Sequence, residues 1–469
     1  MTNAILRGKP DAGNPHVRFD EGEVASAKPR RGSLLYSLIQ GIRIRNFRAL
    51  RDVSMGMLWQ DRAAEPLTPL SVIIGKNGAG KSSILDAFGF LSDCLRVGVE
   101  EACVSNGRGG FEKIHSKESE GAIEFELYFR ESPSDRPITY ELSIDQDPNG
   151  RVFVKSERLR QRRKGQSRGM PFSFLILNNG RGIVWKGDAY GFYESESAVS
   201  VEALLRKARE DAAEANEIEE VELADNRKLG IATLGALKQH PRISAFRKFI
   251  EGWYLSYFRP DAARSLPLAG PQKQLDVHGD NLGNVVQYMR REHPDRFDAV
   301  LRKIACRIPG VERIDTLPTD DGRLLLRFYN KGFSTPLYAQ QMSDGTLKLF
   351  AYLLLLSLPE NPPFVCIEEP ENGLYHKLLK VLCDEFRMFA SSSRKAPQMF
   401  ITTHQPYLVD NFDPKEVWIL EKGDDGFSKV RRASEDPLVV SLVEQELPLG
   451  SLWYSAYLDG DDGAASHAH

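Results

Sequence analysis

The sequence predicts an α/β fold with a mixed sheet, and two observations carry this prediction. Residues 75–82 read GKNGAGKS and lie between the apolar run Leu70–Ile74 and the helix-like stretch SSILDAF. Two apolar runs far downstream, Phe364–Ile367 and Gln398–Ile401, are short and end in polar residues. Buried parallel strands have this pattern, with their functional side chains at the carboxyl ends.

The order of strand, glycine-rich loop and helix at residues 70–88 is the order that a phosphate-binding site requires. Three glycines let consecutive backbone N–H groups face phosphate oxygens at the positive end of the helix. Lys81 is expected to reach the β and γ phosphates of ATP, and the Ser82 hydroxyl to ligate Mg²⁺. The predicted nucleotide-binding residues of this loop are Gly75, Lys76, Asn77, Gly78, Ala79, Gly80, Lys81, Ser82 and Ser83.

The two downstream runs predict the remaining parts of the site. The first ends in Glu368-Glu369, and the second in Thr402-Thr403-His404. We expect Glu368 to join Ser82 in holding Mg²⁺, and Glu369 to orient or deprotonate the attacking water. Alone, such an acidic pair is usually a polar loop and such a histidine a satisfied interior residue, but the phosphate loop favours the catalytic interpretation.

A third segment, Gln341 to Thr346, precedes the apolar stretch LKLFAYLLLLSL. Ser343 is expected to cap a helix there, so that its free N–H groups form a second anion site. The apolar run is about half of the length that a membrane span needs, so it predicts a buried helix.

The motifs GKNGAGKS, MSDGT, CIEEPENGL and ITTHQP, in this order, resemble the ABC-type ATPase heads of the RecF, SMC and OLD class. They are most similar to stand-alone bacterial predicted AAA-family ATPases with LSDGT and EEPENGLH signatures. The opening IRIRNFRAL, Ile42 to Leu50, is similar to the first strand of those heads. The resemblance spans residues 38–106 and 322–420, and it implies a P-loop NTPase fold with an antiparallel β layer and a lateral, mostly helical insertion.

The resemblance also implies a homodimer that closes on ATP. MSDGT of one subunit would contact the γ-phosphate held by the other subunit, through Ser343, Gly345 and Thr346. His404 would sense the γ-phosphate. The implied catalytic residues are Glu369, His404 and Lys81, and the implied metal ligands are Ser82 and Glu368.

Three positions depart from the family pattern. Glu368 stands where Asp is frequent, so its metal contact is expected to run through water. Tyr375-His376 stands where many relatives have His-Pro. Gln146 and Gln161 are candidates for the Q-loop glutamine, although a solvated loop is the favoured interpretation of each.

Hydrophobic patterning predicts how the rest of the chain is organised. Alternation predicts strands at Ala122–Phe129, Ile138–Ile144, Arg151–Leu159 and Phe172–Leu177, with a hairpin turn at residues 147–150. Charged helical patterns cover residues 201–228, helices follow at Arg242–Tyr257 and Asn281–Cys306, and a hairpin is expected at Arg313–Tyr329. The predicted segments are a flexible arm (1–33), a first head part (34–106), the β layer (107–198), the lateral helical insertion (199–310), a second head part (311–458) and a disordered tail (459–469).

Composition indicates a cytoplasmic enzyme without a membrane segment. The net charge of −3 gives no global basic field for nucleic acid, and the five cysteines show no paired spacing. The first 33 residues lack the apolar core of a signal peptide.

Two segments leave alternatives open. A basic cluster at a predicted hairpin tip either binds a DNA backbone or is a solvated loop, the favoured interpretation; its residues are Arg158, Arg160, Arg162, Arg163, Lys164 and Arg168. The aromatic segment Leu447–Leu458 docks either on the chain's own core, which is favoured, or on a partner protein.

The sequence therefore predicts an ATP-hydrolysing head. The leading hypothesis is an ATP-gated sensor or clamp in bacterial DNA maintenance or anti-phage defence, acting with a separate effector because the chain shows no Toprim-type nuclease cluster. The alternative is a nucleotide-gated scaffold that restrains a toxin or nuclease. A transporter motor is disfavoured by the insertion and by MSDGT.

Overall fold

The computed structural model of this protein describes most of the chain beyond the N-terminal segment. The chain divides into two units, Met1–Leu34 and Leu35–His469, and every described residue lies in the second unit. The described ranges are 38–131, 135–162, 171–186, 218–308, 310–392, 396–455 and 457–458.

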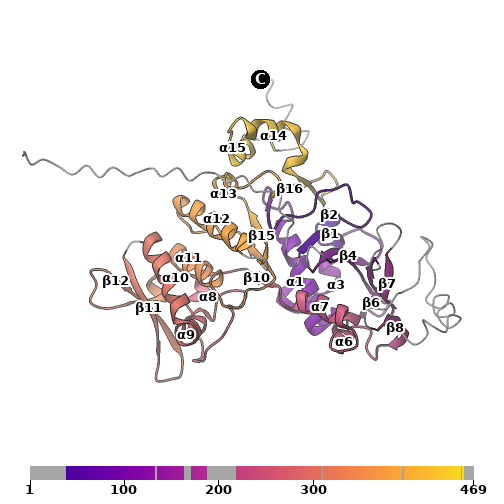
Figure 1. The fold of residues 1–469 in the computed structure, drawn as a ribbon, viewed down its shortest axis with the longest axis horizontal. Coiled ribbons are helices and arrows are strands. Elements are labelled where there is room, and N and C mark those ends of the chain that lie inside the picture. Colours follow the sequence, from indigo (N-terminus) through magenta and orange to yellow (C-terminus); the bar gives the residue numbers. More distant parts are fainter. Residues whose placement is uncertain are drawn as a thin grey trace, which may run out of the picture. The chain divides into compact units, whose positions relative to one another are not determined.

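A six-stranded mixed sheet carries the predicted motifs (Figure 1). Five strands are parallel and β17 is antiparallel to β16, in the order β10-β14-β15-β3-β16-β17. The two downstream strands predicted from apolar runs are confirmed as β14 and β15. The strands are β3 (Leu70–Ile74), β10 (Tyr254–Ser256), β14 (Phe364–Glu368), β15 (Gln398–Thr403), β16 (Val417–Lys422) and β17 (Ser428–Arg432).

Both faces of this sheet are buried, because successive side chains of a strand point to opposite faces. On β14, Phe364 and Cys366 pack in one apolar cluster with α1 (Lys81–Val97), while Val365 and Ile367 pack in a second cluster with α11 (Asp344–Leu355) and α12 (His376–Ser391). The apolar stretch after MSDGT is thus the buried helix α11. Among the described helices, none has both the length and the apolarity that crossing a bilayer demands.

An eight-stranded antiparallel sheet forms the β layer, in the order β2-β1-β4-β5-β6-β7-β8-β9. The four predicted strands and the turn at 147–150 are confirmed, and β1 and β2 extend the layer before the phosphate loop. The strands are β1 (Leu38–Phe47), β2 (Leu50–Gly56), β4 (Ile123–Arg130), β5 (Ile138–Gln146), β6 (Val152–Gln161), β7 (Phe172–Asn178), β8 (Arg181–Trp185) and β9 (Ile218–Glu222).

The end of the charged stretch at 201–228 differs from the helical prediction. Ile218–Glu222 is the edge strand β9, which pairs antiparallel with β8 from Trp185 opposite Ile218 to Arg181 opposite Glu222. The free edge of β8 supplies backbone partners, and this tertiary pairing overrides the helical propensity of a glutamate-rich segment. Residues 201–217 lie outside the described part of the chain.

The segment predicted as a lateral helical insertion also contains a strand. The helix predicted for Arg242–Tyr257 ends at Glu251, and the chain then forms β10, which pairs in parallel with β14. This part of the chain therefore completes the six-stranded sheet. The elements before and after β10 are α6 (Gly230–Leu234), α7 (Pro241–Glu251), α8 (Pro260–Ala263), α9 (Leu282–Glu292) and α10 (Pro294–Arg307).

The predicted hairpin at 313–329 is confirmed by β11 (Val311–Pro318) and β12 (Leu324–Asn330), which with β13 (Leu337–Tyr338) form a three-stranded sheet. The short helices are α2 (Val99–Val104), α3 (Phe111–Ile114), α13 (Pro406–Val409), α14 (Pro437–Glu444) and α15 (Leu449–Tyr454), with 3-10 turns at Ser105–Gly107, Ala339–Gln341 and Ala433–Glu435.

The aromatic C-terminal segment docks on the chain's own core, as favoured from the sequence. Leu449, Leu452 and Leu458 are buried in the cluster that contains α11, and α15 packs on α13. Tyr454 points away and is 84% exposed.

A single buried amide ties the two large sheets together. Gln398 at the start of β15 is fully buried, and its Oε1 accepts the N–H of Ile39 on β1 at 3.0 Å. Its Nε2 donates to the carbonyl oxygens of Ile39 (3.0 Å) and Thr68 (3.2 Å). Because a buried backbone group is costly to leave without a partner, this side chain sets where β1 meets β15.

The buried carboxyl of Glu157 on β6 makes the fold sensitive to pH. Its oxygens accept hydrogen bonds from the N–H of Gly230, the N–H of Ile231 (3.0 Å) and the hydroxyl of Tyr140 (3.0 Å). Burial outweighs these bonds and raises the pKa of Glu157 from 4.5 to about 7. Between these two values the folded state binds the proton more tightly than the unfolded chain, so stability falls as the pH rises through this window.

We therefore predict that Glu157→Gln removes a pH-dependent loss of stability. Between pH 4.5 and 7 the free energy of unfolding of the parent should fall by about 3 kcal/mol relative to that of the variant, measured by urea denaturation. The exposed Glu101→Gln serves as the matched control and should follow the parent. Parallel pH profiles for parent and Glu157→Gln would contradict the assignment.

Candidate functional site

The glycine-rich loop joins β3 to α1 as predicted. Lys76, Asn77 and Gly78 at its tip are exposed, whereas Lys81 is buried. The Nζ of Lys81 donates to the carbonyl oxygens of Gly75 (2.8 Å) and Lys76 (3.3 Å). The ammonium thus lies under the loop, beside the N-terminal turn of α1, whose N–H groups have no partners within the helix.

Two glycines have left-handed backbone conformations that this loop needs. Gly78 has φ +80° with open space around it, and Gly80 has φ +105°. A Cβ at Gly80 would overlap Ser428 Oγ, which donates to the carbonyl of Ala79 at 2.6 Å. β17 therefore supports the loop from below, and a side chain at Gly80 would displace it.

The parallel register brings the predicted acidic residues to this loop. Thr403 of β15 is level with Ile74 of β3, and Thr402 is level with Glu368 of β14. The carboxyl ends of the three strands therefore share one edge of the sheet. There, Ser82 Oγ donates a hydrogen bond to Glu368 Oε1 across 286 residues of sequence.

Glu369 and His404 form a pair at the same edge. The Nδ1 of His404 lies 3.1 Å from Glu369 Oε1, and Asn372 Nδ2 donates to Glu369 Oε2 at 2.8 Å. Burial opposes ionisation of Glu369, but the bonds from Asn372 and His404 outweigh it and keep the pKa below 4.5. Glu369 is thus a carboxylate at neutral pH, which is the form that accepts a proton from water or orients it.

Glu371, two residues after Glu369, holds the end of β15 next to this pair. It is buried, and its Oε1 accepts from Thr403 Oγ1 (2.7 Å) and from the N–H of His404 (3.1 Å). Burial raises the pKa of Glu371, and these hydrogen bonds oppose the shift. Glu371 was not predicted as a site residue from the sequence, although it lies within the EEPENGL motif.

The charges at this edge suit a divalent cation. Burial lowers the pKa of Lys81, while the nearby carboxylates Glu369, Glu371 and Glu368 oppose that shift. The ammonium of Lys81 therefore faces three carboxylates in a partly desolvated site, and the buried ammonium of Lys348 lies near the same three. The Ser82 hydroxyl and the Glu368 carboxylate are oxygen ligands of the kind that Mg²⁺ prefers, and they already lie within hydrogen-bond reach of each other.

The MSDGT segment begins α11, as predicted. Ser343 caps the helix, because its Oγ accepts the N–H of Thr346 at 3.2 Å and lies 2.8 Å from Thr346 Oγ1. Arg264, after α8, bonds to the carbonyl of Met342 (2.9 Å) and pairs with Asp344. Within the described ranges, the hydrogen bonds of this segment do not reach the loop at 75–83. Ser343 itself is exposed.

Gly345 packs directly on the turn that follows Glu369. A Cβ at Gly345 would lie 2.5 Å from the carbonyl oxygen of Gly373. The start of α11 and the turn at 369–373 therefore form one closely packed unit, which only a residue without a side chain permits.

A cavity of about 600 Å³ lies beside Ser82 and Asp86 of α1. Tyr257 and Arg259, which follow β10, line it together with His278. This wall was not predicted from the sequence, because β10 has only three residues and lies within a predicted helical segment.

The two candidate Q-loop glutamines lie in the β layer, in β5 and β6, and not at the sheet edge formed by β3, β15 and β14. Gln146 Nε2 donates to the carbonyl of Gly150, in the hairpin turn of its own strand, at 2.9 Å. Gln161 is buried, and its Nε2 donates to the carbonyl of Arg136 at 2.8 Å. Both side chains have local structural partners, so neither is assigned to the site.

The described part of the basic cluster is not a solvated hairpin tip. Arg158 and Arg160 lie within β6; Arg160 is buried and pairs with Glu141, and Arg158 donates to Ser173 Oγ at 2.6 Å. Burial lowers the pKa of Arg158 to about 10. The guanidinium of Arg162 lies over the ring of Trp59. Arg163, Lys164 and Arg168 lie outside the described residues.

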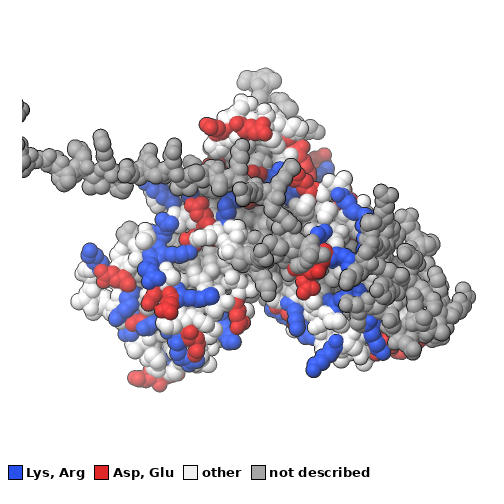
Figure 2. All heavy atoms as spheres, viewed as in Figure 1, with Lys and Arg blue, Asp and Glu red and all other residues white. Residues whose placement is uncertain are grey.

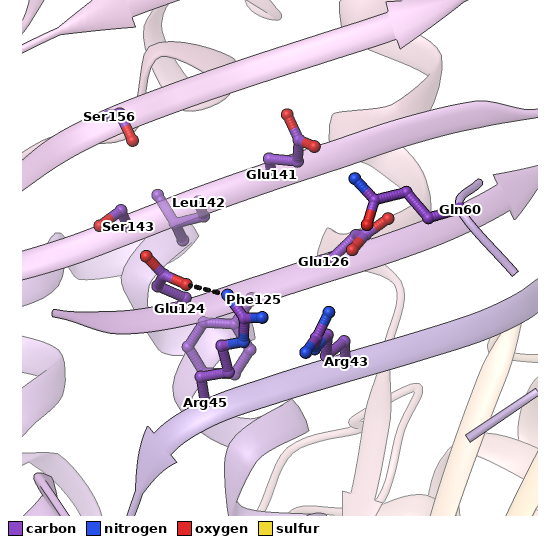
Figure 3. A pocket seen from close by; sticks show the side chains of 10 residues that line it. All are labelled: Arg43, Arg45, Gln60, Glu124, Phe125, Glu126, Glu141, Leu142, Ser143 and Ser156. Carbon is purple, nitrogen blue, oxygen red and sulfur yellow. Dashed lines mark hydrogen bonds and ion pairs between the residues drawn. The ribbon is translucent and has the colours of Figure 1, made fainter. Parts of the chain in front are cut away.

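A second hollow, of about 370 Å³, lies on the β layer (Figure 3). Arg43 and Arg45 of β1 face Glu124 and Glu126 of β4 across it, and Arg45 pairs with Glu124 at 3.1 Å. Its charges thus largely neutralise one another. On the face shown in Figure 2, basic and acidic side chains are likewise interspersed.

Residues 70–410 match the family model described as "AAA domain, putative AbiEii toxin, Type IV TA system". No curated protein matches the chain.

Three similar solved structures are heads of SMC proteins. They are an Smc head bound to the C-winged helix domain of ScpA (15% identity, 84% of this chain and 97% of that chain, TM-score 0.45), the SMC head domain from Thermotoga maritima (13%, 84% and 98%, 0.38), and an Smc head domain with an extended coiled coil bound to the C-terminal domain of ScpA, derived from Pyrococcus furiosus (14%, 87% and 100%, 0.42).

We predict that Gly345→Ala separates α11 from the turn at 369–373. The added methyl meets a backbone oxygen, so the helix must shift, at a cost of about 1–3 kcal/mol in stability. Thermal denaturation measures the loss, and hydrogen exchange should show faster opening of residues 369–373. Gly270→Ala is the control, because a Cβ there meets open space. Equal stability of the two variants would contradict the close packing.

Proposed function

The chain belongs to this AAA-domain family, and we propose that it binds ATP with Mg²⁺ and hydrolyses it at the edge formed by β3, β15 and β14. The observation that carries this proposal is the convergence of four motif residues at that edge. Ser82 bonds to Glu368, and Glu369 lies 3.1 Å from His404. Lys81 lies beneath the loop that joins β3 to α1.

Each residue takes one task in the proposed reaction. The loop N–H groups and Lys81 hold the phosphates, and Ser82 and Glu368 hold Mg²⁺, which neutralises phosphate charge when bound. Glu369 accepts a proton from the attacking water or orients it. His404 fixes the Glu369 carboxylate and would sense the γ-phosphate.

We predict that Glu369→Gln and Lys81→Ala separate turnover from binding. The first variant keeps the phosphate contacts but loses the proton acceptor, so kcat should fall about 100-fold or more while the Kd for ATP stays near that of the parent. The second removes a cation from the cradle and should raise the Kd about ten- to a hundred-fold. Phosphate release and fluorescent-ATP titration measure the two effects. Parental turnover in Glu369→Gln would reject its role.

The exposed Ser343 at the start of α11 supports an assembly of two chains. Ser343 and the half-buried Gly345 and Thr346 lie at the N-terminal end of this helix, where anions are favoured, and no hydrogen bond between described residues joins them to the phosphate loop of their own chain. We propose that they complete the nucleotide site of a second copy, so that the active form is an ATP-closed homodimer.

We predict that two inactive variants complement each other. Ser343→Arg blocks the signature and Lys81→Ala disables the phosphate loop, so each homodimer should be inactive. A mixed dimer regains one site, which combines the loop of the first subunit with the signature of the second. Each mixed dimer should turn over at about half of the parental rate, so an equimolar mixture, in which about half of the dimers are mixed, should recover about a quarter of the parental turnover. A monomer by light scattering at saturating ATP, with turnover independent of protein concentration, would reject the dimer.

For the biological role we propose an ATP-gated sensor or clamp in DNA maintenance or anti-phage defence, with a separate effector. The family description, which names a putative toxin of a toxin–antitoxin system, supports a defence role over that of a transporter motor. It equally suits the alternative, a nucleotide-gated scaffold that restrains a toxin or nuclease. Turnover measured with and without DNA separates the two, because only the DNA-linked clamp requires stimulation.

A further inference from the structure

A buried lysine connects the signature helix to the catalytic turn. Lys348 lies on α11, five positions after Ser343, and is only 4% exposed. Its Nζ donates to the carbonyl oxygens of Glu369 (2.9 Å) and Asn372 (3.2 Å). These two carbonyls bracket the turn that presents the Glu369 carboxylate.

The environment of Lys348 explains why a cation is tolerated there. Burial lowers the pKa of Lys348, and four carboxylates oppose that shift. They are Glu371, Glu369, Asp344 and Glu368. A buried ammonium must be compensated and hydrogen-bonded, so its removal takes a donor from both turn carbonyls and a positive charge from the neighbourhood of these carboxylates.

The turn needs such support because its backbone is strained. Glu369 has φ +41°, in the left-handed region that side-chain-bearing residues rarely adopt. Its N–H bonds to the carbonyl of Thr402 at 3.0 Å, which fixes the turn on the side of the sheet. Lys348 fixes the same turn on the opposite side, from the helix.

We infer that Lys348 is a positioning residue for Glu369, so that α11 serves two sites: its N-terminal end completes the site of a second copy, and its first buried turn orders the catalytic carboxylate of its own chain. This inference rests on the proposed ATP hydrolysis by a homodimer. The two ends of this part of α11 thus serve different subunits: Ser343 acts in trans, on the nucleotide site of the second copy, and Lys348 acts in cis, on the site of its own chain.

The first experiment separates binding from turnover. Lys348→Met keeps the length of the side chain and removes the ammonium. Its kcat should fall about ten- to a hundred-fold, because the carboxylate is displaced, while its Kd for ATP should stay within about threefold of the parent. Lys303→Met is the matched control, because it removes an ammonium that pairs with Glu385, outside the described site. Unchanged kcat in Lys348→Met would overturn the inference.

The second experiment uses the complementing pair of variants to test whether Lys348 acts in cis or in trans. The single active site of the mixed dimer uses Lys81 and Glu369 of the Ser343→Arg subunit and the signature of the Lys81→Ala subunit. Lys348→Met added to the Ser343→Arg subunit should reduce turnover about ten- to a hundred-fold, whereas the same change in the Lys81→Ala subunit should cost less than about threefold. Equal losses in the two placements, which misfolding would also produce, overturn the inference.

Two outcomes distinguish the inference from the function on which it rests. No turnover by the parent would reject the proposed function, and the inference with it. If the parent turns over ATP but Lys348→Met does not act in cis in the mixed dimer, the inference alone is rejected. Hydrogen exchange without nucleotide is the independent readout, and Lys348→Met should speed exchange at residues 369–373 while Lys303→Met leaves it unchanged.

Discussion

The parallel register of β3, β15 and β14 is the constraint on which the site depends. Ile74 is level with Thr403, and Thr402 is level with Glu368. Because strand residues advance about 3.3 Å each and alternate in direction, a slip of one residue would turn Glu368 to the other face, and a slip of two would carry it about 7 Å from Ser82. The sheet thus brings together motifs that lie hundreds of residues apart, and no local loop geometry replaces that alignment.

At this edge, several hydrogen bonds hold the strained backbone of Glu369 in place. The left-handed backbone of Glu369 costs on the order of 1–3 kcal/mol, and it persists because surrounding contacts over-determine it. The Thr402 carbonyl, the Asn372 amide and the Lys348 ammonium each restrain one part of the turn. Glu371 accepts hydrogen bonds from Thr403 Oγ1 and the backbone N–H of His404, which tie the turn to the end of β15.

The sequence predicted the buried strands, the phosphate loop and the edge where the acidic residues meet, because apolar runs and glycine spacing are local signals. It did not predict β9 or β10, since a short strand is specified by its neighbour's free edge and not by its own composition. Arg158 and Arg160 were predicted to lie in a basic loop, but they lie within a strand, where Arg160 forms an ion pair with Glu141 of the neighbouring strand. The role of Lys348 could not be predicted from the sequence. A single lysine in an apolar helix does not reveal its partners, and the carbonyl groups that it contacts are located only in the structure.

The position of β3 in its sheet also bears on how the chain is made. β3 lies between β15 and β16, so neither of its hydrogen-bonding edges can be paired as in the folded protein until residues from 398 onward have been synthesised. At synthesis rates of about 5–20 residues per second, the nascent strand spends on the order of tens of seconds with apolar faces and unpaired edges. Translation of this chain therefore creates a long interval in which both edges of β3 are unpaired, and in this interval the strand is open to holding chaperones on the ribosome.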